Sequence, residues 1–272
     1  MTEKNDQRNR FKLQIQPRRK DLLKWEMLSA AEDLNYEVLE LSTPPALNEP
    51  RRCESYMEWY RQSGRAASVH GCFVDVNPGS GDLAFRELSR RRCVESCEAA
   101  RRIGAKHVVL HSSCAPFLRG AYLEGWADAC AGFYEELAQK YDLFLCIENS
   151  SDVDSEPLKE LMRRTSDSRV CVCLDVGHAH YSRLTLEEWF ADLGERIGYL
   201  HLSDNCGLFD EHLPLGEGTV DWALADRLWR SLGRSIPVTV ENNNPDSAAR
   251  SIHFLKEHGY FLELMSRQEA EH

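Results

Sequence analysis

The residues of this chain best suited to chemistry are acidic and histidine side chains that directly follow short apolar segments. In VCVCLDVGHAHY, at residues 170–181, alternating apolar residues stop at Asp175, and His178 follows three positions later. A carboxylate and an imidazole at the end of a buried strand are typical ligands of zinc or manganese. The alternative is that Asp175 and His178 serve as turn or helix-capping residues.

The same arrangement recurs along the chain. Glu148 and Glu241 each come directly after apolar residues, where an ionised carboxylate is costly unless it is paired or bound to a metal. A single histidine in such a place is more often a hydrogen-bonded core residue, so the prediction of a metal site depends on the conjunction of five histidines with four carboxylates. The full set of candidate ligands is His70, His111, Glu148, Asp175, His178, His201, Asp210, His212 and Glu241.

These side chains require a fold that brings many strand ends to one rim. Eight apolar strand signals alternate with helical segments, at residues 11–16, 38–41, 67–70, 107–111, 143–147, 170–174, 197–202 and 236–240. Repeated β-α order with continuous apolar strands predicts a parallel sheet. Eight such units predict an α/β protein with a closed (β/α)8 TIM barrel, in which functional residues lie at the C-terminal ends of the strands.

The length of 272 residues fits one barrel domain. No G-x-G-x-x-G follows the first strand, which argues against a dinucleotide-binding sheet. The longest helix signal, at residues 83–103, should end at Gly104, and a helix at residues 246–265 should close the chain. We expect residues 1–10 to be a disordered polar tail and residues 11–272 to form a single TIM-barrel metalloenzyme domain.

Composition limits the partners and the compartment. The formal net charge of −11 disfavours broad binding of nucleic acid or of an anionic membrane. No apolar run is long enough for a transmembrane helix, and the N-terminal residues are too polar for a signal peptide. The ten cysteines include no C-x-x-C pair. We therefore expect reduced core thiols in a cytoplasmic protein.

Seven segments of the chain resemble the xylose-isomerase-like TIM barrels. This superfamily includes sugar and sugar-phosphate isomerases and epimerases, and also nucleases of the endonuclease IV type. The resemblance extends from about residue 11 to about residue 265. The segments that carry it are VHGCFVDVNPGS, VVLHSS, CIENS, VCLDVGHAH, YLHLSDN, DEHLPLGEGTVDW and VTVEN.

The resemblance implies roles for the candidate ligands. Glu148, Asp175, His201 and Glu241 match a metal tetrad that both branches share. In the isomerase branch this tetrad holds one divalent metal, and the two glutamates act as acid and base. The nuclease branch implies two further metals. One would be bound by His70, His111 and a bridging Glu148, and the other by His178, Asp210 and His212.

Further residues are candidates for supporting roles. The expected substrate contacts are Arg119, His180, Arg183 and Asn149. The two arginines could bind a phosphate or a carboxylate, although arginines exposed at the surface are the plainer reading. Asp204 and Asn205 follow the strand that carries His201 and could orient this histidine.

Two classes of function fit these residues. The leading prediction is a divalent-metal-dependent, phosphodiesterase-like hydrolase acting on a sugar-phosphate or abasic nucleic acid phosphoester. It would bind up to about three metals, zinc first and manganese as the alternative. The second is a sugar or sugar-phosphate isomerase or epimerase with one metal, in which Glu148 and Glu241 transfer a proton. The expected partner is a small-molecule sugar or phosphoester; the charge disfavours nucleic acid, and the oligomeric state is not predicted.

Overall fold

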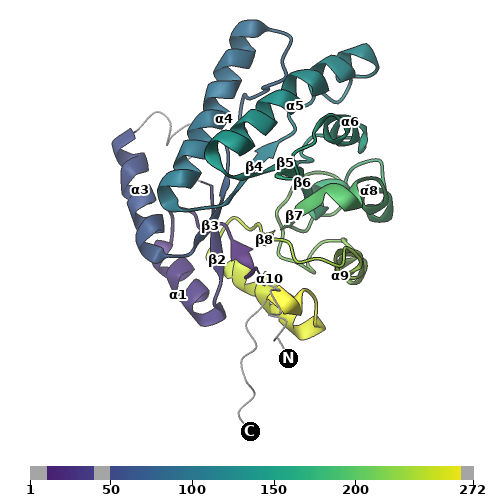
Figure 1. The fold of residues 1–272 in the computed structure, drawn as a ribbon. Coiled ribbons are helices and arrows are strands. Elements are labelled where there is room, and N and C mark those ends of the chain that lie inside the picture. The colour runs from purple at the N-terminus through teal and green to yellow at the C-terminus, as the bar shows by residue number, and fades with distance from the viewer. Residues whose placement is uncertain (1–10, 40–49, 265–272) are drawn as a thin grey trace, which may run out of the picture.

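The barrel closes where its first strand pairs with its last. The computed structural model describes residues 11–39 and 50–264, in which eight parallel strands pair in sequence order (Figure 1). Strand β1 (Gln14–Ile15) pairs with β2 (Asn35–Val38) on one side and with β8 (Val238–Val240) on the other. This confirms the predicted α/β fold with a closed (β/α)8 barrel. The predicted tail at residues 1–10 lies outside the described residues.

Helices surround the barrel on its outside (Figure 1). The remaining strands are β3 (Ala66–His70), β4 (His107–His111), β5 (Phe144–Glu148), β6 (Val170–Asp175) and β7 (Ile197–Leu202). The helices are α1 (Leu22–Glu32), α3 (Pro50–Ser63), α4 (Leu83–Ile103), α5 (Ala121–Tyr141), α6 (Glu156–Arg164), α7 (Val176–His180), α8 (Leu186–Leu193), α9 (Trp222–Ser231) and α10 (Pro245–His258). Two 3-10 turns, η1 (Gly194–Arg196) and η2 (Leu262–Leu264), complete the described elements.

Buried apolar residues form two separate clusters. The larger lies between the strands and the helices, and the smaller consists of Val109, Cys146, Cys171, Cys173 and Tyr199. Successive side chains of a strand point to opposite faces, so the smaller cluster occupies the inside of the barrel. Nine of the ten cysteines have described side chains; all nine are free, and eight of them are buried. None of the helices in this part of the chain is both long and apolar enough to cross a bilayer.

Several predicted bounds were wrong; strand β1 spans only Gln14–Ile15 of the predicted residues 11–16, and three other differences have identifiable reasons. Strand β2 begins at Asn35 rather than at residue 38, because its inward side chains are polar and do not give an apolar run; residues 40 and 41 of the predicted strand lie outside the described residues. Strand β8 begins at Val238, since Pro237 has no amide hydrogen for the ladder. Helix α10 ends at His258, because Gly259 takes a left-handed conformation with φ 73°.

Helix α7 is short and was not predicted. It begins directly after strand β6, and its N-cap is Asp175, whose side chain accepts a hydrogen bond from the backbone N–H of His178 at 2.6 Å. The cap satisfies an amide that the helix itself cannot pair. Because α7 starts without a connecting loop, Asp175 and His178 stay close to the end of the barrel.

One buried carboxylate, Asp204, holds the loop between β7 and α9. Its Oδ1 accepts hydrogen bonds from the backbone N–H groups of Asn205 and Val220, at 2.9 and 3.2 Å. Its Oδ2 accepts from the backbone N–H of Gly216 and from the indole N–H of Trp222, both at 2.8 Å. This loop carries two candidate ligands, so Asp204 fixes the part of the chain on which they lie.

The expected role of Asp204 and Asn205 in orienting His201 is therefore corrected. Every side-chain hydrogen bond described for Asp204 goes to its own loop or to the start of α9. The side chain of Asn205 donates to the carbonyl of Gly177 at 2.8 Å and accepts from the N–H of Gly207 at 2.8 Å. Asp204 thus joins the loop to itself and to helix α9, and Asn205 joins it to helix α7.

We expect Asp204→Ala to lower the free energy of unfolding by about 3 kcal/mol, because it leaves buried N–H donors without an acceptor. Urea denaturation of the metal-free protein measures this. The matched control is Glu217→Ala in the same loop, whose carboxylate pairs with Arg250 at 2.7 Å while both side chains are about half exposed. This control should change the free energy by less than about 0.5 kcal/mol. Equal effects of the two substitutions would contradict the role given to Asp204.

Candidate metal centre

Every strand of the barrel contributes one polar side chain to a ring at its C-terminal end. Inward positions are two residues apart along a strand, and each strand has a polar residue at an inward position near its C-terminal end, within the strand or one residue beyond it. In strand order the members of this polar ring are Gln16, Glu37, His70, His111, Glu148, Asp175, His201 and Glu241. Six of them are candidate ligands from the sequence alone. Gln16 and Glu37 are not.

The signal for the two missed residues was present in the chain. Gln14 and Gln16 alternate along the first strand, as do Asn35 and Glu37 along the second. All four would have been found by asking which residues share the inward parity of a barrel strand, instead of which residues follow an apolar run. Gln16 and Glu37 are both buried.

Four members of the polar ring form a compact buried group: Glu148, Asp175, His201 and Glu241. One possible ligand atom from each lies within 4.8 Å of all the others. The Nδ1 atom of His201 is 3.1 Å from Glu241 Oε1 and 3.4 Å from Glu148 Oε1. The structure thus brings together the four residues that the family resemblance implies as a metal tetrad.

Buried atoms of this tetrad have no hydrogen-bond partner. They are both carboxylate oxygens of Glu148, Oδ2 of Asp175 and Nδ1 of His201. Buried polar atoms are almost always satisfied, and an unsatisfied group often marks an ion site. Carboxylate oxygens and imidazole nitrogen are also the donor set for zinc and manganese. The residues therefore fit a divalent metal.

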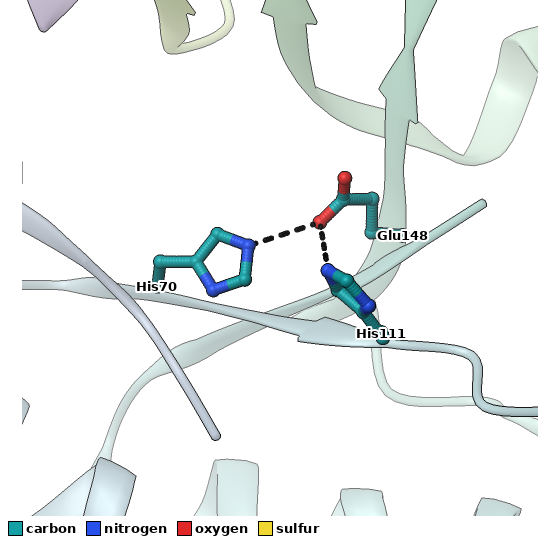
Figure 2. A group of neighbouring side chains, drawn as sticks. All are labelled: His70, His111 and Glu148. Atoms are coloured by element: carbon teal, nitrogen blue, oxygen red, sulfur yellow. Dashed lines mark ion pairs between the residues drawn. The ribbon is translucent and has the colours of Figure 1, made fainter. Parts of the chain in front are cut away.

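A second cluster shares Glu148 with the tetrad. His70 Nε2 and His111 Nε2 lie 3.4 and 3.5 Å from the same oxygen, Glu148 Oε2. Figure 2 shows both imidazoles directed at this one oxygen from neighbouring strands. Their ligand atoms also lie within 4.8 Å of one another. A carboxylate with one oxygen toward each cluster is suited to bridging two cations.

The third expected cluster is more open. Asp210 Oδ2 lies 3.4 Å from His178 Nε2 and 2.9 Å from His212 Nε2. Unlike the other two clusters, this triad does not bring all its ligand atoms within 4.8 Å in the described part of the chain. His212 has a positive φ of 50°, a sparsely populated conformation for a residue other than glycine. In this conformation the imidazole of His212 faces Asp210.

The second nitrogen of these histidines is fixed by a separate hydrogen bond. Nδ1 of His70, His178 and His212 donates to a backbone carbonyl, that of Gly71, Asn149 and Glu241 respectively. In each case Nε2 is left for the centre. His201 has the opposite arrangement, with Nδ1 toward the tetrad and Nε2 3.1 Å from Glu37 Oε2. Such hydrogen bonds set the tautomer that a metal ligand requires.

Burial and the mixture of charges shift the pKa values of the acidic residues. Burial raises the pKa of Asp175 to about 7, and the carboxylates of Glu241 and Glu148 add to this effect, although His178 opposes it. Burial alone would also raise the pKa of Glu148. The imidazoles of His201 and His111 outweigh it and hold this pKa well below its ordinary value.

The pKa values of the histidines are also shifted in both directions. Burial lowers the pKa of His111 to about 3. Burial would lower the pKa of His212 too, but its hydrogen bond to Asp210 raises that pKa to about 9. The pKa of His178 also rises well above its ordinary value, because Asp175 and Asp210 outweigh the effect of its burial. A metal must therefore displace protons from His178 and His212.

The clusters open into a cavity of about 300 Å³. Its lining includes Arg18, Leu39 and Phe73 beside the histidines and carboxylates. Arg18 donates to Gln16 Oε1 at 3.1 Å.

The four expected substrate contacts do not line this cavity. Arg119 pairs with Asp154 at 2.7 Å, and His180 and Arg183 line a different cavity of about 410 Å³. The side-chain amide of Asn149 donates to the carbonyl of Asp175 at 3.1 Å and accepts from its N–H at 2.7 Å. Asn149 therefore positions a tetrad residue through its backbone.

We expect the metal-free protein to lose stability as the pH rises from about 6.5 to about 9. His212 has a folded pKa of about 9 against an ordinary value of 6.5, so its contribution is complete below pH 6.5 and is lost as the pH passes through 9. Asp175, with a folded pKa of about 7 against an ordinary value of 3.8, adds to this loss only at the start of the range, because its contribution is lost between pH 3.8 and 7. Zinc should stabilise more at pH 9 than at pH 6.5, because fewer protons compete for the ligands.

Melting temperatures with a chelator and with zinc, at pH 6.5, 7.5 and 9, measure both trends. His212→Gln should flatten the chelator profile between pH 7.5 and 9. A metal-free protein whose melting temperature rises over this range would contradict the assigned pKa shifts.

Comparison with known proteins agrees with the fold. An uncharacterised protein of Methanocaldococcus jannaschii, MJ1311, is 27% identical over 214 residues, which cover 75% of this chain and 72% of the relative. Among solved structures, a D-tagatose 3-epimerase-like protein matches with a TM-score of 0.73 at 22% identity, over 91% of this chain and 97% of its own. The TTHB071 protein from Thermus thermophilus, soaked with ZnCl2, matches with a TM-score of 0.72 at 24% identity, over 91% and 96%.

The match to a family model shows the protein family to which this chain belongs. The model described as xylose isomerase-like TIM barrel matches residues 28–258. This range contains every residue of the tetrad and of the two further clusters. With its closed eight-stranded barrel and the model's match over most of its length, the chain belongs to the xylose isomerase-like TIM barrel family.

Proposed function

We propose that this protein is a divalent-metal-dependent isomerase or epimerase that acts on a sugar or a sugar phosphate. The observation that carries the proposal is the convergence of Glu148, Asp175, His201 and Glu241 within 4.8 Å of one another. Two of these ligands, Glu148 and Glu241, also line the cavity. The sequence placed this function second to a hydrolase, and the comparisons favour the reversed order.

The tetrad would hold the metal, with zinc favoured and manganese as the alternative. When bound, the metal would polarise the carbonyl and the adjacent hydroxyl of a ketose. Similarity to a D-tagatose 3-epimerase-like protein supports a sugar substrate, and similarity to a protein studied with zinc chloride supports zinc.

The two glutamates supply the proton transfer. Isomerisation and epimerisation both remove a proton from a carbon next to a carbonyl and return one. The lowered pKa of Glu148 keeps this carboxylate ionised, which is the form that both a metal ligand and a proton acceptor require. Glu241 Oε1 accepts a hydrogen bond from Gln16, and its Oε2 lies 3.9 Å from His212 Nδ1. Glu241 is thus held at the cavity wall as the second proton-transfer group.

The cavity suggests the size and charge of the substrate. Small-molecule sites range over about 300–1,000 Å³, so 300 Å³ suits a monosaccharide. Arg18 lines this cavity, and a guanidinium is suited to an anionic group such as a phosphate. A phosphorylated or acidic sugar therefore fits the lining better than a neutral one.

A multinuclear phosphoester hydrolase is the second candidate. It is favoured by one specific observation, the presence of two further clusters around the same cavity. His70 and His111 face the free side of Glu148, and His178 and His212 face Asp210. In the isomerase these histidines would instead contact the hydroxyl groups of the sugar.

The proposed function predicts exchange of a substrate proton with solvent. Zinc- or manganese-loaded protein in D2O, given a panel of ketoses and ketose phosphates, should incorporate deuterium at the carbon next to the carbonyl, as followed by proton NMR. Glu148→Gln and Glu241→Gln should each slow this exchange by about 100-fold or more, since each removes a proton-transfer group.

Glu187→Gln, a change of the same kind at an exposed position of helix α8, is the control and should leave the exchange rate unchanged. Turnover of a phosphodiester by the same preparation, with no exchange for any sugar of the panel, would overturn the proposal in favour of the hydrolase.

A further inference from the structure

Glu37 is a buried carboxylate of the polar ring to which the proposed chemistry gives no role. It occupies the last inward position of strand β2, and its side chain is fully buried. Its two oxygens face different partners. Oε2 contacts the imidazole of His201, and Oε1 accepts a hydrogen bond from Gln16.

The first contact determines which nitrogen of His201 is available to a metal. Neutral imidazole carries its proton on one nitrogen and offers a lone pair on the other. His201 Nε2 lies 3.1 Å from Glu37 Oε2, so the proton is held there. Nδ1, 3.1 Å from Glu241 Oε1 and 3.4 Å from Glu148 Oε1, is then left with its lone pair toward the tetrad.

His201 differs in this respect from three other histidines of the site. Those three are oriented by backbone carbonyls, whereas His201 is oriented by a charged side chain. A carboxylate behind a metal-binding imidazole fixes the ring and makes the ligating nitrogen more basic. The contact therefore favours metal binding through electrostatics as well as through geometry.

The second contact extends to another tetrad residue. Gln16 Nε2 donates to Glu37 Oε1 at 2.6 Å and also to Glu241 Oε1. Arg18 donates to Gln16 Oε1 at 3.1 Å, which directs the amide N–H groups toward the two carboxylates. Through one amide, Glu37 is linked to the position of Glu241.

Hydroxyl groups inside the barrel hold the carboxylate of Glu37 in place. Its Oε2 accepts hydrogen bonds from the hydroxyl groups of Tyr199 at 2.7 Å and Thr239 at 3.2 Å, and lies 3.4 Å from that of Ser68. These donors stabilise a charge inside the barrel that would otherwise be costly. They also restrict the carboxylate to the position from which it reaches His201.

We propose that Glu37 is a positioning residue of the metal centre. It sets the tautomer of His201 directly and the orientation of Glu241 through Gln16, and so increases the affinity of the tetrad for a divalent metal. This inference rests on the tetrad of the proposed function being the metal site.

The test is the zinc affinity of Glu37→Gln and Glu37→Leu, measured by competition with a chelator of known affinity. We expect the dissociation constant to rise by about 10-fold for the glutamine variant and by about 100-fold for the leucine variant. Circular dichroism and thermal unfolding of the metal-free variants show whether they are folded. If the leucine variant does not fold, the glutamine variant carries the test, because it keeps the volume and the polarity.

Glu160→Gln is the matched control. Glu160 is also a buried carboxylate, but it lies on helix α6 and pairs with Arg164, so this change should leave the dissociation constant within about threefold of the wild type. Long-range proton–nitrogen NMR spectra of the zinc-loaded wild type should show His201 protonated at Nε2.

Wild-type affinity in folded Glu37 variants would overturn the inference and leave the proposed function standing. An equal loss of affinity in Glu160→Gln and Glu37→Gln would also overturn it, since that result indicates a general effect of removing a buried charge. Failure of the wild type itself to bind zinc would overturn the proposed function and this inference together.

Discussion

The structure depends on the burial of several carboxylates around one histidine. Glu37, Glu148, Asp175 and Glu241 are all buried near His201 at the end of the barrel. Isolated buried charges are strongly unfavourable, so such a group persists only with compensating partners. Imidazoles, hydroxyl groups and an amide compensate part of the charge, and the unsatisfied atoms of the tetrad are directed at the place where a cation would compensate the rest.

The barrel and its loops share the task of positioning these groups. Strand parity brings one polar side chain from every strand to the same end, which a helical bundle or an open sheet would not do. The groups beyond the strands need separate supports. Asp175 caps helix α7 with Oδ1 and keeps Oδ2 for the centre. Asp204 fixes the loop that carries Asp210 and His212. The carboxylate of Asp175 therefore serves both the fold and the metal centre, whereas that of Asp204 serves the fold alone.

The fold was predictable from the sequence because six of the eight strands are apolar runs of parallel-sheet type between amphipathic helices. The first two strands were harder. In β2, polar Asn35 and Glu37 alternate with Tyr36 and Val38, which hid its true start. The ligand candidates at strand ends were visible because Glu148 and Glu241 follow apolar residues directly. Glu37 does not follow an apolar run, so this pattern does not reveal it. Its partners Gln16, Tyr199 and His201 are distant in sequence and become its neighbours only when the barrel closes.

We propose that Glu148, Asp175, His201 and Glu241 together bind one divalent metal. Crystals of the zinc-loaded protein, measured with X-rays on both sides of the zinc absorption edge, test it most directly. A strong anomalous peak is expected within about 2.0–2.3 Å of ligand atoms from these four residues, with His201 bound through Nδ1. Zinc bound elsewhere, with no peak among these four residues at full zinc loading, would contradict it.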